Sequence, residues 1–219
     1  MATTPVFAWR YQGLSDPPNG AILGENLALD TEATVAGLDA RLAAAEALLT
    51  ARLPYRDRHV CTGAEPSITF SGIPTTLRSL HVEYLARGDT GASHTTTLMR
   101  INGSAAAVYG TAFTEQDGAT ETPFATAGNT AQFIGYTPGT GTGAGYFAVG
   151  EVDFPNWDSV LSTAGINYLF RAIANVSLRV LANGGGVFLA AGPYTSLTFL
   201  PTAGNFVAGT AFQLIGERA

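Results

Sequence analysis

Apolar and polar residues alternate in short runs over most of the chain after residue 54. In the run Ser79–Glu83, for example, Leu80 and Val82 alternate with polar residues, which predicts a strand with one buried face. The predicted strands are Ser67–Ser71, Thr76–Arg87, Thr95–Ile101, Ala105–Ala112, Thr130–Tyr136, Gly145–Phe154, Tyr168–Val176, Gly186–Ala191, Thr195–Leu200 and Val207–Ile215. Breaks rich in Gly, Pro, Asn and Asp separate them, at Ser71–Pro74, Gly88–Ala92, Asn102–Ser104, Pro138–Gly143, Asn183–Gly186 and Ala203–Asn205. This pattern predicts a mainly β chain, with residues 54–219 forming a β-sandwich head, most simply a jelly roll. Pro155–Ile166 is the only helical turn expected within it.

Residues 27–53 follow a different period, because apolar residues recur there at alternating steps of three and four. The positions of this seam are Ala28, Thr31, Val35, Leu38, Leu42, Ala45 and Leu49. A heptad seam is typical of a coiled coil, and Arg41 and Glu46 fall at the g and e positions that pair between parallel helices. We therefore expect a helix from Ala28 to Arg52, stopped by Pro54, that forms a short trimeric coiled-coil stalk. The alternative is an amphipathic helix packed on its own domain.

Residues 1–26 show neither period. The prolines of this segment, among them Pro17 and Pro18, favour an extended and irregular backbone. Phe7, Trp9 and Tyr11 are interleaved with it, and aromatic side chains are enriched at protein interfaces. We expect an anchoring arm that docks on a partner. The alternative is a terminus whose aromatics fold back on the body.

Composition narrows the classes of function. Apolar residues make up 46% of the 219 residues and charged residues only 13%, which disfavours a disordered chain. The net charge is −6 and the 11 basic residues form no basic stripe, so nucleic acid is not an expected partner. No apolar run is long enough for membrane insertion. A β protein with so few charges is expected to hide surface in an oligomer or larger assembly.

The residues that could carry chemistry are few. His81 and Glu83 share a strand face, where a solvated surface is the expected environment. Cys61, the only cysteine, lies near His59, but this pair lacks a third metal ligand in the sequence. Glu151 and Asp153 share another strand face, and nothing in the sequence brings two carboxylates to glycosidase spacing. We therefore predict no catalytic residue, no cofactor and no metal.

A glycan site on such a head is expected to combine a flat aromatic ring with short polar side chains on loops. The candidates are Gln116 and Asp117 in a loop over Thr114–Thr122, Tyr136 beside the Thr137–Gly143 loop, and Trp157. The alternative for Trp157 is a core position that closes one end of the sandwich, since tryptophan is highly buried on average.

Four segments carry a family resemblance. They are Ser196–Gly216 (SLTFLPTAGNFVAGTAFQLIG), Leu98–Gly103 (LMRING), Gly145–Trp157 (GYFAVGEVDFPNW) and Gly13–Gly20 (GLSDPPNG) before the alanine-rich helix. With these segments the chain resembles bacteriophage virion fibre and spike proteins, of the minor tail or capsid fibre type found in phages of high-GC actinobacteria.

The resemblance implies a non-enzymatic structural protein of the virion, assembled in the cytoplasm of a bacterial host. It further implies a homotrimeric appendage on tail or capsid, bound to other virion proteins through the N-terminal arm, whose head contacts host surface glycans. It supplies no catalytic residues. The alternatives are a tail spike enzyme that degrades polysaccharide and a cellular lectin-like jelly-roll module.

Overall fold

The computed structural model describes residues 31–46, 54–117, 119–143, 145–158, 166–174 and 180–218. The chain divides into two compact units, Met1–Arg52 and Leu53–Ala219. The predicted arm residues Phe7, Trp9 and Tyr11 lie outside the described residues, as do Ala28 and Leu49 at the two ends of the predicted seam.

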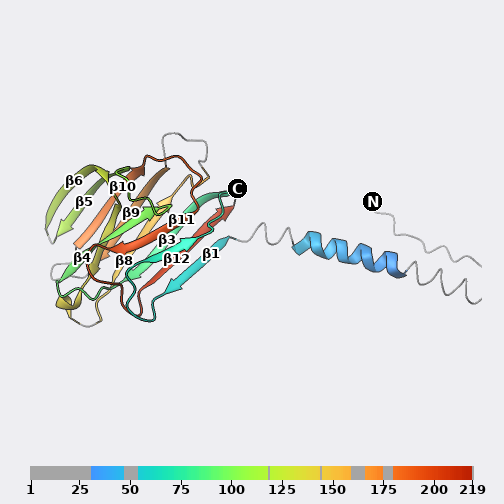
Figure 1. The fold of residues 1–219 in the computed structure, drawn as a ribbon, viewed down its shortest axis with the longest axis horizontal. Helices are drawn as coiled ribbons and strands as arrows, with labels where there is room; N and C mark the ends of the chain where they lie inside the picture. Colours follow the sequence, from blue (N-terminus) through green and yellow to red (C-terminus); the bar gives the residue numbers. More distant parts are fainter. Residues whose placement is uncertain are drawn as a thin grey trace, which may run out of the picture. The chain divides into compact units, whose positions relative to one another are not determined.

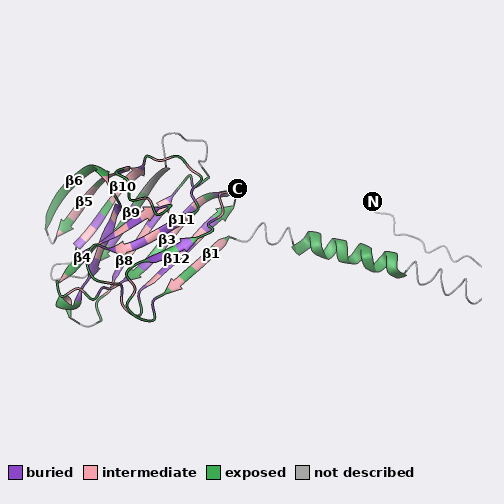
Figure 2. Ribbon diagram, in the orientation of Figure 1, coloured by how far each residue is buried: buried purple, intermediate pink, exposed green. Residues whose placement is uncertain are grey.

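Residues 31–46 of the first unit form an α-helix, as the heptad spacing predicts, and every residue of this helix is exposed (Figure 2). The exposed fractions of the seam residues Val35, Leu38 and Leu42 are 50%, 56% and 60%, and Ala45 is exposed as well. The apolar face of the helix is therefore open within the part of the chain that the structure describes. This helix is not long and apolar enough to cross a membrane.

The second unit is a sandwich of two antiparallel sheets, which confirms the mainly β prediction (Figure 1). Its elements are β1 (Tyr55–Val60), β2 (Ile68–Ser71), β3 (Leu77–Ala86), β4 (His94–Ile101), β5 (Tyr109–Asp117), β6 (Thr120–Asn129), β7 (Gln132–Pro138), the 3₁₀ turn η1 (Thr140–Thr142), β8 (Ala148–Phe154), β9 (Ile166–Ala174), β10 (Val180–Phe188), β11 (Ser196–Pro201) and β12 (Ala211–Arg218). The larger sheet has eight strands in the order β1-β12-β3-β8-β9-β10-β5-β6, and the smaller has four in the order β2-β11-β4-β7.

By strand order, β1-β12-β3-β8 and β2-β11-β4-β7 match the two sheets of a pair of Greek keys, and every connection between successive members of these groups passes from one group to the other except that from β4 to β7. We interpret this arrangement as a jelly roll, which stays a prediction. In that interpretation the hairpins β5–β6 and β9–β10 are insertions that widen one sheet to eight strands.

The core lies between the sheets because alternate residues of each strand point inward. Phe199 of β11 stacks on Phe212 of β12, with 4.4 Å between ring centroids, and so joins the two sheets. Tyr84 stacks on Phe212 from the neighbouring strand β3 at 5.2 Å. The Tyr84 hydroxyl donates a hydrogen bond of 2.7 Å to the carbonyl of Ile134, which lies where the register of β7 on β4 shifts. Aromatic packing thus fixes the sandwich, and one phenol satisfies a carbonyl at a bulge.

Two of the observed strands, β1 and β6, are not among the predicted ones. Three others, β5, β10 and β12, are displaced by at least three residues at both ends from the predicted Ala105–Ala112, Gly186–Ala191 and Val207–Ile215. The predicted break Asn183–Gly186 lies inside β10. Its glycines serve a close approach rather than a turn, because a Cβ on Gly184 would lie 2.3 Å from the Cβ of Phe113. Within Pro155–Ile166, residues 155–158 form a turn and residues 159–165 lie outside the described part of the chain.

Candidate functional site

A groove opens where the larger sheet extends past the smaller one. Strand β7, at the edge of the four-stranded sheet, packs mainly across β8 and β9 and makes fewer contacts with β5 and β10. The inward face of the β5–β6 hairpin is therefore only partly covered, and Phe124 of β6 remains 41% exposed. The resulting groove has a volume of about 430 Å³ and is lined by residues of β4, β5, β6 and β7.

Aromatic rings form a continuous series along this groove, which we call the aromatic ladder and define as Phe124, Phe113, Phe133 and Tyr136. Phe113 stacks between Phe124 and Phe133, with centroid distances of 4.9 and 4.3 Å. Tyr136 meets the edge of Phe133 at 5.2 Å, and His94 meets Tyr136 at 5.1 Å. Both faces of the Phe113 ring are covered by its neighbours, so the exposed ring of the series is Phe124, where a sugar ring or another apolar face could stack.

Polar side chains accompany the aromatic ladder. Thr96, Thr126, Asn129 and Thr130 line the same groove. The Tyr136 hydroxyl donates a hydrogen bond of 2.5 Å to Glu115, and burial, followed by this bond and the charge of Glu115, raises the pKa of Tyr136. The phenol therefore stays protonated and orients a carboxylate beside the rings. Hydroxyl and amide groups next to stacked rings can hydrogen-bond the hydroxyls of a sugar.

Of the four residues predicted to contact glycans, only Tyr136 lies in this groove. The predicted Thr114–Thr122 loop is wrong, because its residues belong to two paired strands: Gln116 pairs with Glu121 and Asp117 with Thr120. Gln116 and Asp117 therefore lie at the tip of a hairpin, outside the residues that line the groove.

Trp157 lies in the core, which is the alternative to its predicted role in glycan contact. It is 1% exposed and packs against Phe154 and Tyr194, at centroid distances of 5.3 and 6.0 Å. Its indole ring has no free face on which a glycan could stack in this structure.

Sequence reasoning missed Phe113, Phe124 and Phe133. A usable signal was present: Asp117 followed by Gly118, between two runs of Thr, Ala and Phe, is a hairpin signal. A two-residue turn at Asp117 and Gly118 would place Phe113 opposite Thr122, so this signal predicts the hairpin but not its register, since Asp117 pairs with Thr120 and Phe113 with Phe124.

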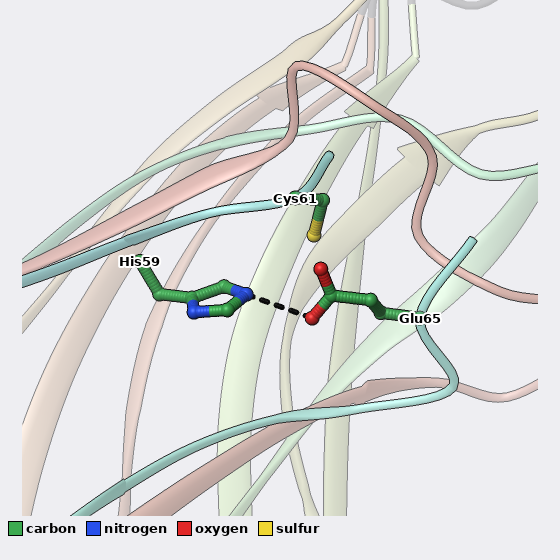
Figure 3. A group of neighbouring side chains, drawn as sticks. All are labelled: His59, Cys61 and Glu65. Carbon is green, nitrogen blue, oxygen red and sulfur yellow. Dashed lines mark hydrogen bonds and ion pairs between the residues drawn. The ribbon is translucent and has the colours of Figure 1, made fainter. Parts of the chain in front are cut away.

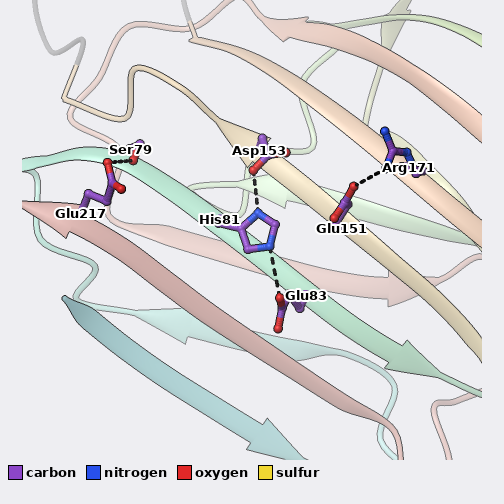
Figure 4. Close-up of polar contacts among 7 residues, drawn as sticks. All are labelled: Ser79, His81, Glu83, Glu151, Asp153, Arg171 and Glu217. Carbon is purple, nitrogen blue, oxygen red and sulfur yellow. Dashed lines mark hydrogen bonds and ion pairs between the residues drawn. The ribbon is translucent and has the colours of Figure 1, made fainter.

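A second polar cluster lies on the outer face of the larger sheet, across β3, β8 and β9 (Figure 4). His81 Nδ1 lies 2.6 Å from Asp153 Oδ1, and His81 Nε2 lies 3.4 Å from Glu83 Oε1. Arg171 Nη1 lies 3.3 Å from Glu151 Oε1. Burial lowers the pKa of His81, but hydrogen bonds and charges from Asp153 and Glu83 outweigh it, so the pKa is raised. Glu151 and Asp153, the candidate carboxylate pair, are thus each held by a basic partner on an open sheet surface.

A third cluster lies where β1 ends and the chain turns (Figure 3). His59 Nε2 lies 2.7 Å from Glu65 Oε2, and the ligand atoms of His59, Cys61 and Glu65 all lie within 4.8 Å of one another. The expectation that His59 and Cys61 lack a third partner is therefore wrong, because the turn after Cys61 brings Glu65 back to them. Burial, then the charge of Glu65 and a hydrogen bond to it, raise the pKa of Cys61 to about 11.

Comparisons of the chain with protein-family models, with curated proteins and with solved structures return no match.

Proposed function

We propose that the protein is a non-enzymatic structural protein of a phage virion, a homotrimeric fibre, spike or decoration on tail or capsid. In this proposal the helix mediates trimer formation, the β-sandwich head contacts host surface glycans, and residues 1–26 attach to other virion proteins. The family resemblance supports the virion setting and the choice of trimer over dimer. The observation that carries the proposal is the open apolar seam of the helix.

The seam supports self-association because its side chains are half or more exposed. Val35, Leu38 and Leu42 follow the a and d spacing, and three copies of such a seam bury one another in a parallel bundle. A helix of this length gains most of its stability from such packing rather than from its own hydrogen bonds.

The test of the trimer is mass in solution. Light scattering after size exclusion should give the mass of three chains for the full-length protein. Leu42→Asp should yield monomers, because it places three charges in one seam layer. Ala40→Asp is the matched control: it adds the same charge at an exposed position outside the seam and should stay trimeric. A trimeric Leu42→Asp variant would contradict the seam assignment.

The aromatic ladder supports the glycan part of the proposal. Phe124 offers an exposed ring face, while threonine and asparagine side chains lie beside it. Binding to isolated actinobacterial cell-wall polysaccharide should weaken about fivefold in Phe124→Ala, since a lost stacking contact is worth about 1 kcal/mol. Leu169→Ala removes an exposed apolar side chain from the outer sheet face and should bind unchanged. Equal binding by both variants would overturn the role of the ladder. Release of reducing sugar from the polysaccharide would favour the spike-enzyme alternative instead.

A further inference from the structure

The cluster at the end of β1 is built on a fixed backbone. The Cys61 N–H donates to the Thr210 carbonyl at 2.8 Å, and the Gly209 N–H donates to the Cys61 carbonyl at 2.9 Å. Glu65 exchanges two backbone hydrogen bonds with Phe206, of 2.9 and 2.8 Å. Both residues are thereby tied to the segment that precedes β12. His59 lies on β1, which pairs with β12 through His59 and Phe212.

The three side chains offer one nitrogen, one sulfur and one oxygen. Zinc bonds of about 2.0–2.3 Å in a tetrahedron place the ligand atoms about 3.3–3.8 Å apart. The His59–Glu65 pair is closer than this range at 2.7 Å, and no two of the three ligand atoms are more than 4.8 Å apart. Small side-chain rotations on the anchored backbone therefore suffice to form the ligand set.

We propose that His59, Cys61 and Glu65 bind a divalent transition-metal ion, with Zn²⁺ the best match to the donor set and water as the fourth ligand. The sulfur is nearly enclosed, since Cys61 is 2% exposed, whereas the side chains of His59 and Glu65 are 42% and 28% exposed. The ion thus enters from the side of His59 and Glu65, where water can complete the tetrahedron.

The proton balance of binding is simple. The thiol of Cys61 loses its proton to solvent, and the resulting thiolate and the Glu65 carboxylate together neutralise the two charges of the ion. The ion takes the place of the proton between His59 Nε2 and Glu65 Oε2. A neutral imidazole moves this proton through solvent to Nδ1, and an imidazolium, which already carries one on Nδ1, releases it to solvent, so in both cases the ring coordinates through Nε2. A thiolate ligand selects Zn²⁺ or Co²⁺ over the hard ions Mg²⁺ and Ca²⁺.

The cluster of His81, Glu83 and Asp153 provides an internal control. It has an imidazole and two carboxylates, but no sulfur, and it lies on an exposed sheet face (Figure 4). A substitution of His81 therefore removes a histidine that is paired with carboxylates, as His59 is, and leaves the proposed metal site unchanged.

Cobalt reports the site directly, because thiolate-bound Co²⁺ has a charge-transfer band in the near ultraviolet and Cys61 is the only cysteine. Full-length protein, stripped with a chelator and titrated with Co²⁺, should develop this band and lose it when one equivalent of Zn²⁺ is added. His59→Gln and Glu65→Gln should weaken Co²⁺ affinity at least about tenfold, and Cys61→Ser should abolish the band. His81→Gln should behave as the unaltered protein.

Glu65→Gln keeps the size of the side chain and an oxygen that can accept from His59, so it guards against simple misfolding. Zn²⁺ should raise the melting temperature of the unaltered protein and of His81→Gln. The melting temperature of Glu65→Gln should rise much less. The absence of a band in the unaltered protein would overturn the proposal. A band of equal affinity in His59→Gln and Glu65→Gln would also overturn it, because Cys61 would then bind the metal without them.

Discussion

Strands β3, β8 and β9 have one face in the core of the sandwich and one face exposed to solvent, and the two faces differ in burial and in composition. Their inward residues, such as Tyr84, Val152 and Phe170, are at most 4% exposed and belong to one aromatic and aliphatic core. On the outer face, cross-strand neighbours form a row of apolar residues and, two residues along each strand, a polar row. The apolar row is Val60, Ala211, Leu85, Val149, Ile173 and Leu181. The polar row is Arg58, Gln213, Glu83, Glu151, Arg171 and Asn183.

The inner face stabilises the head, whereas the outer face is the surface that the head presents to its surroundings. The inner face excludes water and carries the burial energy of folding. The outer row is apolar yet open, with Leu85, Val149 and Ile173 at 38%, 48% and 48% exposure. Such a row adds little to the stability of a single chain, and its apolar composition suits contact with another surface.

The largest expected change in stability comes from a substitution in the core. Trp157→Ala should lower the free energy of unfolding by about 3–5 kcal/mol, because it leaves a cavity beside Phe154 and Tyr194. Chemical denaturation followed by far-ultraviolet circular dichroism, which does not depend on tryptophan fluorescence, measures this change in the free energy of unfolding. Val149→Ala, on the outer row, is the control and should change stability by less than about 1 kcal/mol. Comparable losses of unfolding free energy in the two variants would contradict the difference between the inner and the outer face.

A smaller effect is expected from one buried hydroxyl. Tyr84→Phe keeps the ring stacked on Phe212 but leaves the Ile134 carbonyl without its 2.7 Å hydrogen bond. The expected cost is about 1–3 kcal/mol, the penalty of a buried acceptor left unpaired. Denaturant unfolding of Tyr84→Phe and the unaltered protein, side by side, provides the number. An unchanged midpoint would mean that this carbonyl finds another donor.

The smallest effect belongs to the outer face and depends on pH. Since the folded-state pKa of His81 is raised, its stabilisation is full below the unfolded-state pKa and is lost as pH rises through the folded-state pKa. The stability lost in His81→Gln should therefore be greater at about pH 5.5 than at about pH 8.5, on either side of the ordinary value near 6.5. Urea unfolding at both pH values measures this difference. In an Asp153→Asn background the difference between the two pH values should shrink, and the opposite trend would contradict the assigned cause.

The sequence predicted the sandwich because its core strands alternate strongly, as Leu80, Val82 and Tyr84 do in β3. It missed β1 and β6 because edge strands carry little hydrophobic signal. β1 reads YRDRHV with no residue fully buried, and β6 has only exposed or half-buried residues and contains Pro123. The break predicted in β10 failed because a glycine run signals a turn in sequence, whereas here it admits a neighbouring strand.

The sites were less accessible to prediction because they depend on tertiary neighbours. Tyr136 was predicted for its aromatic ring, but the ladder residues Phe113 and Phe124 lie on a hairpin whose central part, Thr114–Thr122, was predicted to be a loop. His59 and Cys61 were noticed, yet the position of Glu65 depends on its backbone pairing with Phe206, far along the chain. Long-range pairing of this kind leaves no periodic trace in the sequence.

The place of β12 between β1 and β3 has a consequence for how the protein is made. Val60 pairs with Ala211, so the first strand of the head leaves the ribosome long before its hydrogen-bonding partner is synthesised. Until then β1 and β3 each lack a neighbour, and the nascent chain exposes unpaired strand edges. Closing so long a loop is slow, so the head completes folding only after translation has passed β12. The segment that anchors Cys61 and Glu65 is made just before β12, so the histidine–cysteine–glutamate cluster assembles at the same late step.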